Sequence, residues 1–373
     1  MAKNILVTGG AGFIGSHLVD ELVARGHKVI FFDNLDEQVH VGGKLPSYLN
    51  KNARFIKGDV RDYESLKKVV TDGIHAIFHQ AACVGVGQSQ YQIKKYIDVN
   101  IGGTSNLLDI LANSKHSVEK LMVAASMSGY GEGLYRCSTC GVTKGQLRDE
   151  KKLEERDWNN YCEKCSQILE PIATTEDAPL VCNSIYAISK KVQEEMVLNF
   201  GKTYSFPVVA LRYFNVYGPR QSLSNPYTGV AAIFMSRIKN NNSPVIYEDG
   251  LQTRDFVSVK DIVQANILAF EKAAANYEVF NVGAHMPLTI LSIAEKLTHL
   301  MKANIKPQIT HKFRKGDIRH CFADISKIKN KLGYRPSVSF ENGMRELVDF
   351  SESVNAIDNF EKATTELRER ALI

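Results

Sequence analysis

Tyr186 and Lys190 stand four residues apart in the segment IYAISKK, and together they could act as a general acid/base. On a helix, this spacing places both side chains on one face. An ammonium group near a phenol favours the phenolate, which moves the phenol's pKa from about 10 toward the working range of an enzyme. The pair therefore predicts a proton-transfer site.

The spacing alone is weak evidence, because the chain contains it twice more, in pairs that we interpret as solvated helix faces: Tyr63 with Lys67, and Tyr91 with Lys95. Only Tyr186 and Lys190 follow, in chain order, a predicted strand that ends in hydroxyl residues, Ser126 and Ser128. In doubly wound sheets, ligands bind at the carboxyl ends of the strands. We therefore expect the chemistry at these residues.

A glycine-rich segment, TGGAGFIG, lies near the start of the chain. Gly10, Gly12 and Gly15 satisfy G-x-G-x-x-G, and Gly9, Gly12 and Gly15 satisfy G-x-x-G-x-x-G. Such glycines allow a tight turn and the close approach of a pyrophosphate, which then lies at a helix N-terminus. A purely structural turn is the alternative, but a predicted strand precedes the segment, a predicted helix follows it, and Asp33 ends the next strand. We therefore expect a dinucleotide here.

Asp33 bears on which dinucleotide binds. Its carboxylate can accept hydrogen bonds from both ribose hydroxyls and would repel a 2′-phosphate, so NAD is favoured over NADP. An aspartate that merely ends an exposed strand is the alternative interpretation.

Four of the seven cysteines form two C-x₂-C pairs separated by 21 residues: Cys137, Cys140, Cys162 and Cys165. Two such knuckles can present four thiolates tetrahedrally, and thiolates select zinc or iron. Because no position would be left open for water, we expect a structural metal, zinc first, with four reduced thiols as the alternative. Basic residues of this region are matched by acidic ones, so we expect no nucleic-acid partner.

Apolar segments alternate with helical patterns along the first half of the chain. We expect strands at 5–7, 29–33, 55–60, 76–79, 121–125 and 208–216, and helices near 63–70, near 100–111 and from about 184. This alternation predicts an α/β fold with a Rossmann-type, doubly wound parallel sheet. Shorter, mixed elements punctuated by proline predict a smaller α/β substrate lobe after residue 218, and the polar stretch with the cysteine pairs predicts a zinc-ribbon-like insertion.

Composition excludes several classes of protein. With 373 residues, 44% hydrophobic and 23% charged, the chain matches a globular protein of about two lobes and not a disordered, collagen-like or disulfide-dense one. Its longest uncharged stretch, residues 73–93, is too polar to span a membrane. The first residues lack the features of a secretion signal, so we expect a cytoplasmic protein with no membrane partner.

Several motifs occur in the order seen in extended short-chain dehydrogenase/reductases: TGGAGFIG, GDV at 58–60, HQAA at 79–82, SMSGYG at 126–131, YAISK at 186–190, RYFNVYGPR at 212–220 and QTRDFVSVKDIV at 252–263. Over about residues 4–350, apart from the insertion, the chain resembles the NAD-dependent nucleotide-sugar epimerases and dehydratases. The string VGVGQS at 84–89 and the segment SMSGYGEGLYRC at 126–137 resemble the branch described as dTDP-L-rhamnose 4-epimerases, which share a cysteine-bearing insertion.

The resemblance implies roles for the matching residues. Tyr186 would be the base, Lys190 would hold the nicotinamide ribose and tune the tyrosine, and Ser126 would hydrogen-bond the reacting sugar hydroxyl. The expected cofactor-binding residues are Gly9, Gly12, Phe13, Ile14, Gly15, Asp33, Asn34, Asp59, Val60, Gln80, Ala81, Ala82, Val84, Asn100, Ser126, Tyr186, Lys190 and Phe214. The expected substrate-binding residues are Ser126, Ser128, Tyr186, Asn215, Arg254, Arg314, Asp317 and the size-gating Cys321.

The residues after Ser126 discriminate among the reactions of this family. Dehydratases carry an Asp-Glu pair there and decarboxylases a Glu, whereas this chain has Met127 and Ser128. The resemblance therefore implies 4-epimerisation of a nucleotide-diphosphate sugar, with dTDP-L-rhamnose or dTDP-6-deoxy-L-talose first. Val84, where UDP-galactose enzymes carry lysine, argues against a simple UDP-galactose assignment. Alternatives are a UDP-hexose, UDP-N-acetylhexosamine or UDP-glucuronate 4-epimerase, a 4-keto reductase and a non-catalytic NAD-binding scaffold.

The resemblance also implies a division of the chain. We expect an NAD-binding domain over residues 1–131 and 176–218, the four-cysteine insertion over 132–175, and a C-terminal helix over 351–373. A lobe that mainly binds the nucleotide sugar would span 219–350, with residues from about 253 to 283 returning to the first domain. A homodimer through the helices that bear Asn100 and Tyr186 is expected from the resemblance.

Overall fold

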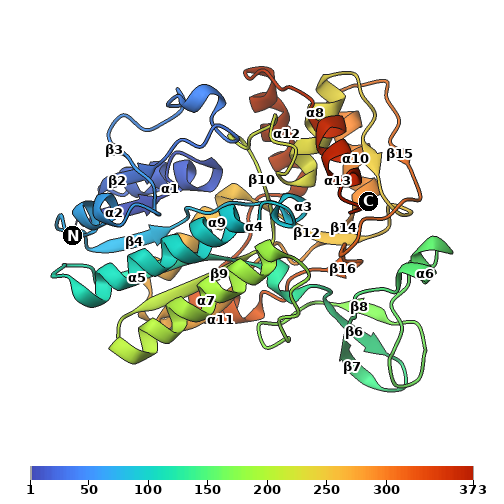
Figure 1. Ribbon diagram of the computed structural model, residues 1–373, viewed down its shortest axis with the longest axis horizontal. Coiled ribbons are helices and arrows are strands. Elements are labelled where there is room, and N and C mark those ends of the chain that lie inside the picture. Colours follow the sequence, from blue (N-terminus) through green and yellow to red (C-terminus); the bar gives the residue numbers. More distant parts are fainter. Residues whose placement is uncertain (1, 373) are drawn as a thin grey trace.

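The structure is a computed structural model that describes residues 2–372. A parallel sheet of seven strands lies at its centre: β1 (Asn4–Thr8), β2 (Lys28–Asp33), β3 (Arg54–Lys57), β4 (Ala76–His79), β5 (Lys120–Ser126), β9 (Val208–Tyr213) and β13 (Glu278–Val282). The strand order is β13-β9-β5-β4-β1-β2-β3 (Figure 1). The strands are largely apolar because both faces of the sheet are buried. The predicted doubly wound, Rossmann-type fold is confirmed.

The sheet carries two separate hydrophobic cores, because successive side chains of a strand point to opposite faces. Ile5 and Val7 contribute to the core beneath α1 and α9, whereas Leu6 contributes to the core beneath α2, α5 and α7. The bounds of these helices are α1 Phe13–Ala24, α2 Tyr63–Val70, α5 Gly103–Asn113, α7 Ile185–Tyr204 and α9 Val259–Glu271. Between β4 and α5 lie α3 (Val86–Ser89), α4 (Ile93–Tyr96) and a π-helical turn (Ile97–Gly102).

The chain leaves the large sheet at Phe214. The sequence predicts one strand over 208–216, but β9 ends at Tyr213, and the Phe214 amide donates to the Val282 carbonyl at 3.0 Å. The next residues start a second sheet, formed by β10 (Asn215–Tyr217), β12 (Thr253–Ser258), β14 (Pro287–Thr289) and β16 (His320–Cys321). Within residues 253–283, α9 and β13 therefore pack in the first domain, whereas β12 belongs to the second sheet.

Helices cover the second sheet and give the smaller lobe its own core. The core contains Phe234 and Met235 of α8, Ile293 of α10 and Met344 of α12. The remaining elements of this part are α8 (Val230–Lys239), α10 (Ile290–Leu300), α12 (Phe340–Glu352), α13 (Phe360–Arg368) and the paired strands β11 (Val245–Ile246) and β15 (Gln308–Ile309). Helix α11 (Ser326–Leu332) packs instead against β13, and its Ile328 and Leu332 belong to a core of the first domain. The C-terminal helix predicted from residue 351 is thus shorter and begins at Phe360.

The insertion forms a small antiparallel sheet that projects from the body of the molecule (Figure 1). Its elements are β6 (Leu134–Cys137), β7 (Gly141–Lys144), α6 (Glu150–Glu154) and β8 (Glu170–Ile172). A minimal core joins Tyr135 and Leu169 to Cys137 and Cys162. Two of the four cysteines are therefore themselves part of the core of this segment.

Among residues 2–372, no helix is both long and apolar enough to cross a membrane.

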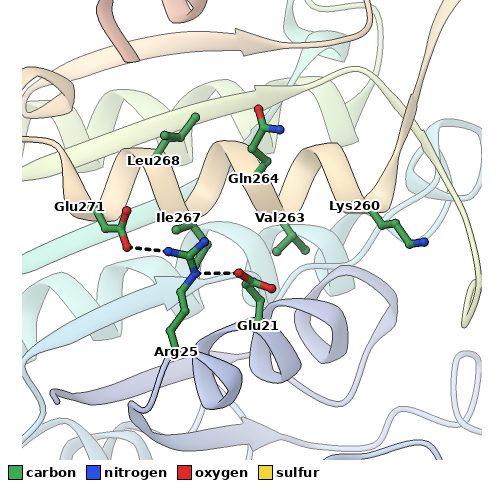
Figure 2. Close-up of a pocket in the computed structure, with 8 residues that line it drawn as sticks. All are labelled: Glu21, Arg25, Lys260, Val263, Gln264, Ile267, Leu268 and Glu271. Carbon is green, nitrogen blue, oxygen red and sulfur yellow. Dashed lines mark hydrogen bonds and ion pairs between the residues drawn. The ribbon is translucent and has the colours of Figure 1, made fainter. Parts of the chain in front are cut away.

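A shallow hollow lies between α1 and α9, on the outside of one helical layer (Figure 2). Arg25 closes it by donating to Glu21 at 2.7 Å and to Glu271 at 2.9 Å. None of the residues expected to bind the cofactor or the substrate lines it. We therefore look for the functional site elsewhere, at the carboxyl edge of the sheet.

His79 makes the stability of the sheet sensitive to acid. Its ring is 1% exposed, with Nδ1 2.7 Å from the Thr8 hydroxyl and Nε2 3.1 Å from the Thr104 hydroxyl. Burial, with a smaller contribution from the charge of Lys190, lowers the pKa of His79 from 6.5 to about 3. Between these two values the unfolded chain binds a proton that the folded chain does not, so stability falls as the pH falls.

We expect this histidine to remove about 1.4 kcal/mol from the free energy of unfolding for each pH unit below 6.5. Urea denaturation at pH 7 and pH 4.5 measures the loss. The variant His79→Gln, which cannot take up a proton, should show a correspondingly smaller loss. Equal losses in the two proteins would contradict the prediction.

Candidate active site

Helix α7 positions the predicted acid/base pair. Its first turn is capped by Ser184, whose hydroxyl accepts from the Ala187 amide at 3.1 Å. The helix therefore begins one residue before Tyr186, and Lys190 follows one turn later. The Tyr186 amide donates to the Ser89 hydroxyl at 3.0 Å, which ties the start of α7 to α3.

Strand β5 brings the predicted serine pair to the same place. Ser126 is the last residue of β5, and its hydroxyl accepts from both the amide (3.2 Å) and the hydroxyl (2.9 Å) of Ser128. Ser126 also lies close enough to the phenol of Tyr186 to act on it, and it lowers the phenol's pKa. Residues 126, 128 and 186 are thus brought together from a strand end, a tight turn and a helix.

Burial dominates the acid/base properties of the pair. Burial raises the pKa of Tyr186 more than the neighbouring Ser126 lowers it. Burial also lowers the pKa of Lys190 to about 7, against a smaller opposing effect of Glu194, and the lysine Nζ donates to Gln193 at 2.5 Å. The prediction that the phenol's pKa moves downward is therefore wrong for the protein alone, because removing water disfavours the charged form of both groups.

The glycine segment forms a turn that leaves a helix N-terminus open. A Cβ on Gly15 would lie 2.2 Å from the Gly9 carbonyl oxygen, and Gly9 itself has φ +69°, so both glycines are required by the turn. A Cβ on Gly12 would meet only that same oxygen, at 3.3 Å. Gly12 is also the residue before α1, and no side chain caps the helix. The free amides and the space before them fit a pyrophosphate.

Asp33, at the end of β2, holds the neighbouring loops in place. Its carboxylate accepts from the Ala11 amide at 3.0 Å and from the Leu35 amide at 2.9 Å. One of these amides belongs to the glycine segment, so Asp33 has a structural role whether or not it binds a ribose. Phe13 and Ile14 follow in the first turn of α1, half-buried.

Asp59 lies beyond the end of β3, which is shorter than the predicted strand over 55–60. Burial alone would raise its pKa, but hydrogen bonds from Arg61 and Asn34 outweigh burial and lower the pKa to about 2. Arg61 donates to both carboxylate oxygens, at 2.9 and 2.7 Å, and Asn34 donates at 2.8 Å. Val60, next in the chain, is buried against α5.

Asn100 fixes the loop that follows β4. Its side chain accepts from the Cys83 amide at 2.8 Å and donates to the Cys83 carbonyl at 3.1 Å, and it also donates to the Ser189 hydroxyl of α7. Val84, which follows Cys83 in the chain, is 44% exposed. Asn100 lies in the π-helical turn, a geometry that often marks functional sites in helices.

The other residues expected to contact the cofactor line the same edge of the sheet. Gln80 donates to the Tyr213 hydroxyl at 3.1 Å, and Ala81 and Ala82 follow it in the half-buried loop. Phe214 is buried where the chain leaves the sheet.

Residues expected to bind the nucleotide sugar lie on the second lobe. Asn215, at the start of β10, has a buried side-chain oxygen with no hydrogen-bond partner among the described residues, which fits a group that awaits a ligand. Arg314 is exposed, donates to Asp317 at 2.7 Å and lies over the Tyr247 ring. The guanidinium of Arg254 donates to backbone carbonyls in β12 and in the neighbouring chain segment.

Cys321 is buried beside the insertion. Its side chain is 1% exposed, and its sulfur lies 3.9 Å from the Thr174 hydroxyl. Burial raises the pKa of this thiol to about 12, so it is neutral at physiological pH.

The two cysteine pairs converge as predicted. The sulfur atoms of the four residues lie within 4.8 Å of one another: Cys137, Cys140, Cys162 and Cys165. The closest pair, Cys137 and Cys165, is 3.4 Å apart, well beyond the length of a disulfide. Backbone amides of the first knuckle lower the pKa of Cys137 to about 7, whereas the neighbouring cysteines, Cys165 first, raise the pKa of Cys140. This donor set fits a tetrahedral metal ion.

Several residues that contact the expected site residues were not predicted from the sequence. They are Arg61 on Asp59, Tyr247 beneath Arg314, and Glu132 and Arg148 beside residues 317–320. Only Arg61, two residues from its partner, is near enough in sequence to have been found.

Two family profiles match successive parts of the chain. Residues 5–152 match the profile described as "NAD dependent epimerase/dehydratase family", and residues 168–347 match "GDP-mannose 4,6 dehydratase". The dTDP-L-rhamnose 4-epimerase of Burkholderia thailandensis is 33% identical over 346 residues, which cover 92% of this chain and 94% of the relative. The chain belongs to the NAD-dependent epimerase/dehydratase family.

Solved structures of the family share the architecture. The UDP-glucose 4-epimerase of Thermotoga maritima, solved with UDP-glucose, superposes with a TM-score of 0.77 at 32% identity, covering 94% of this chain and 99% of the other. The UDP-glucuronic acid 4-epimerase of Bacillus cereus, solved with UDP-glucuronic acid and NAD, gives 0.77 at 27% identity, with 94% and 100% covered. These family members are nucleotide-sugar 4-epimerases, which are isomerases.

Proposed function

We propose that the protein is an NAD-dependent nucleotide-sugar 4-epimerase that interconverts dTDP-L-rhamnose and dTDP-6-deoxy-L-talose. The observation that carries the proposal is that Ser126, at the end of β5, meets Tyr186 and buried Lys190 of the first turns of α7 at one edge of the sheet. The open N-terminus of α1 and Asp33 supply the elements of a dinucleotide site at the same sheet edge.

Each side chain of the proposed site can have one chemical role in epimerisation. The glycine segment and Asp33 would hold NAD, which would supply hydride acceptor and donor chemistry at C4 of the sugar, on one face and then on the other. Tyr186 as phenolate would take the proton of the C4 hydroxyl and give it back to the ketone oxygen, while Ser126 holds that oxygen. Positive charge on Lys190 would favour the phenolate, against the effect of burial.

The choice of reaction rests on the two residues after Ser126. Met127 and Ser128 occupy the positions where dehydratases and decarboxylases carry carboxylates, so this part of the site offers no acid to eliminate water or carbon dioxide. An enzyme that returns its hydride needs no added reductant, whereas a 4-keto reductase would consume one reduced nicotinamide per turnover.

The choice of sugar rests on the B. thailandensis relative and on the insertion. A second candidate is a UDP-sugar 4-epimerase, which the structural likeness to UDP-glucose and UDP-glucuronic acid enzymes favours. NMR of the products from dTDP-L-rhamnose, UDP-glucose, UDP-glucuronate and UDP-N-acetylglucosamine separates these cases. A non-catalytic scaffold would convert none of them.

A homodimer and a cytoplasmic location belong to the same proposal. Ile93 of α4 and Ile188 of α7 are 48% and 42% exposed on the helices expected to form the interface, which supports burial against a second copy. All seven cysteines are free, which suits a reducing compartment.

Removal of one oxygen tests the proposed base. We expect Tyr186→Phe to lower the rate of epimerisation at least about 100-fold, because the variant has no phenolate to take the proton. The NAD content of the purified protein should not change. Tyr63→Phe is the matched control, since Tyr63 donates to Asp109 on the protein surface and belongs to a pair with the same spacing. Full activity of Tyr186→Phe would overturn the proposed mechanism.

We further propose that the four cysteines hold a structural zinc ion. All four ligand positions would be protein thiolates, leaving none for water, and the ion would complete the minimal core of the insertion.

Elemental analysis of protein purified without chelators should find close to one zinc per chain. Cys162→Ser should lower the zinc content and the melting temperature, because one thiolate ligand is lost. Cys182→Ser, outside the cluster, should leave the zinc content unchanged. Iron in place of zinc, or no metal, would contradict the assignment.

A further inference from the structure

The insertion reaches the part of the second lobe where nucleotide-sugar binding is expected. Residues 314–321, here called the substrate segment, contain Arg314, Asp317 and Cys321 and end in β16. In Figure 1, β16 lies beside the small sheet of the insertion. The Gly133 amide donates to the His320 carbonyl at 2.8 Å, so the two segments are in direct backbone contact.

Glu132, at the start of the insertion, binds the backbone of the substrate segment. Its side chain is fully enclosed, and its two carboxylate oxygens accept from the Arg319 amide at 2.5 Å and from the His320 amide at 3.1 Å. The Tyr135 hydroxyl donates to the same carboxylate at 2.8 Å. A buried carboxylate with three donors around it is a strong and directional contact.

Arg148 binds the same segment from the loop between β7 and α6 of the insertion. Its guanidinium donates to the Asp317 carbonyl at 3.1 Å and makes two parallel hydrogen bonds, of 2.8 and 2.7 Å, to Glu248 of the second lobe. Glu248 also accepts from Arg319 at 2.9 Å. The side chains of Arg148 and Glu248 are only 3% and 2% exposed, so water cannot replace a lost partner.

These contacts hold nearly every polar backbone group between Asp317 and His320. The insertion binds the carbonyls of 317 and 320 and the amides of 319 and 320. Arg254, expected to meet the diphosphate, binds the carbonyls of 318 and 319. Before β16 the segment has no regular structure, and its shape depends on the pairing of β16 with β12 and on groups that reach it from elsewhere, the side chains of Glu132 and Arg148 among them.

We propose that Glu132 and Arg148 are positioning residues that hold the substrate segment in its nucleotide-binding shape. The insertion is thereby part of the substrate site and not only an appended metal-binding module. This inference rests on the proposed function, which assigns the nucleotide sugar to Arg314 and Asp317. Neither positioning residue lies among the residues expected to bind NAD.

The test compares Arg148→Met, Arg148→Lys and a control, Arg136→Met, which removes an exposed arginine from β6 of the same insertion. For Arg148→Met we expect KM for the nucleotide sugar to rise about tenfold or more with kcat changed less than threefold, because the segment loses its shape while the chemistry is untouched. NAD and zinc contents should remain those of the parent protein.

The KM of Arg148→Lys should fall between those of the parent protein and Arg148→Met, because lysine keeps the charge but not the paired hydrogen bonds to Glu248. Arg136→Met should behave as the parent. An unchanged KM in folded Arg148→Met, or a loss confined to kcat, would overturn the proposal. If Arg148→Met does not fold, Glu132→Gln, which can accept from only one of the two amides, is judged by the same criteria.

Calorimetric binding of dTDP and UDP, measured on the same variants, separates this proposal from the proposed function. Nucleotide diphosphate binding needs no turnover, so a protein that epimerises no sugar can still show the weakening. Equal affinities in the parent protein and folded Arg148→Met would refute the positioning role even if epimerisation were established.

Discussion

Tyr186 can meet Ser126 only if the chain returns to the sheet edge after an insertion of more than forty residues. The insertion begins soon after Ser126 and ends before Ser184 caps α7. Its two ends are held together, because β6 pairs with β8 and the Leu134 amide donates to the Thr174 hydroxyl at 3.1 Å. The insertion is therefore closed where it joins the first domain, and its length does not keep Ser126 and Tyr186 apart.

Charge burial is the second constraint on the architecture. Lys190 and His79 are enclosed in the first domain and Tyr186 is half-buried there, and loss of water sets the direction of each pKa change. At the insertion, the enclosed charges are paired: Arg148 with Glu248, and Glu132 with backbone amides. Buried ionic groups of this kind confer a fixed geometry more than stability. Such geometry fixes the irregular part of the substrate segment before β16.

Much of the fold and part of the site could be predicted from the sequence, because their signals are local. Apolar strands in alternation with helices, the glycine segment and the paired cysteines each have a local signal. The sheet, the glycine turn and the cysteine cluster form as predicted, although β3 and β9 are shorter than expected. Other features depend on residues far apart. Glu248 meets Arg148 across 100 positions, and Glu132 meets Arg319 across 187. The end of β9 at Tyr213 and the raised pKa of Tyr186 follow from packing, which no local pattern encodes.

Transient oxidation at C4 is tested most directly with dTDP-L-rhamnose that carries deuterium at C4, incubated in ordinary water with the purified protein and no added reductant. If the hydride leaves and returns within one site, the dTDP-6-deoxy-L-talose formed retains deuterium at C4 with inverted configuration. Loss of the deuterium to solvent, or a requirement for added NADH in each turnover, would contradict the proposed reaction.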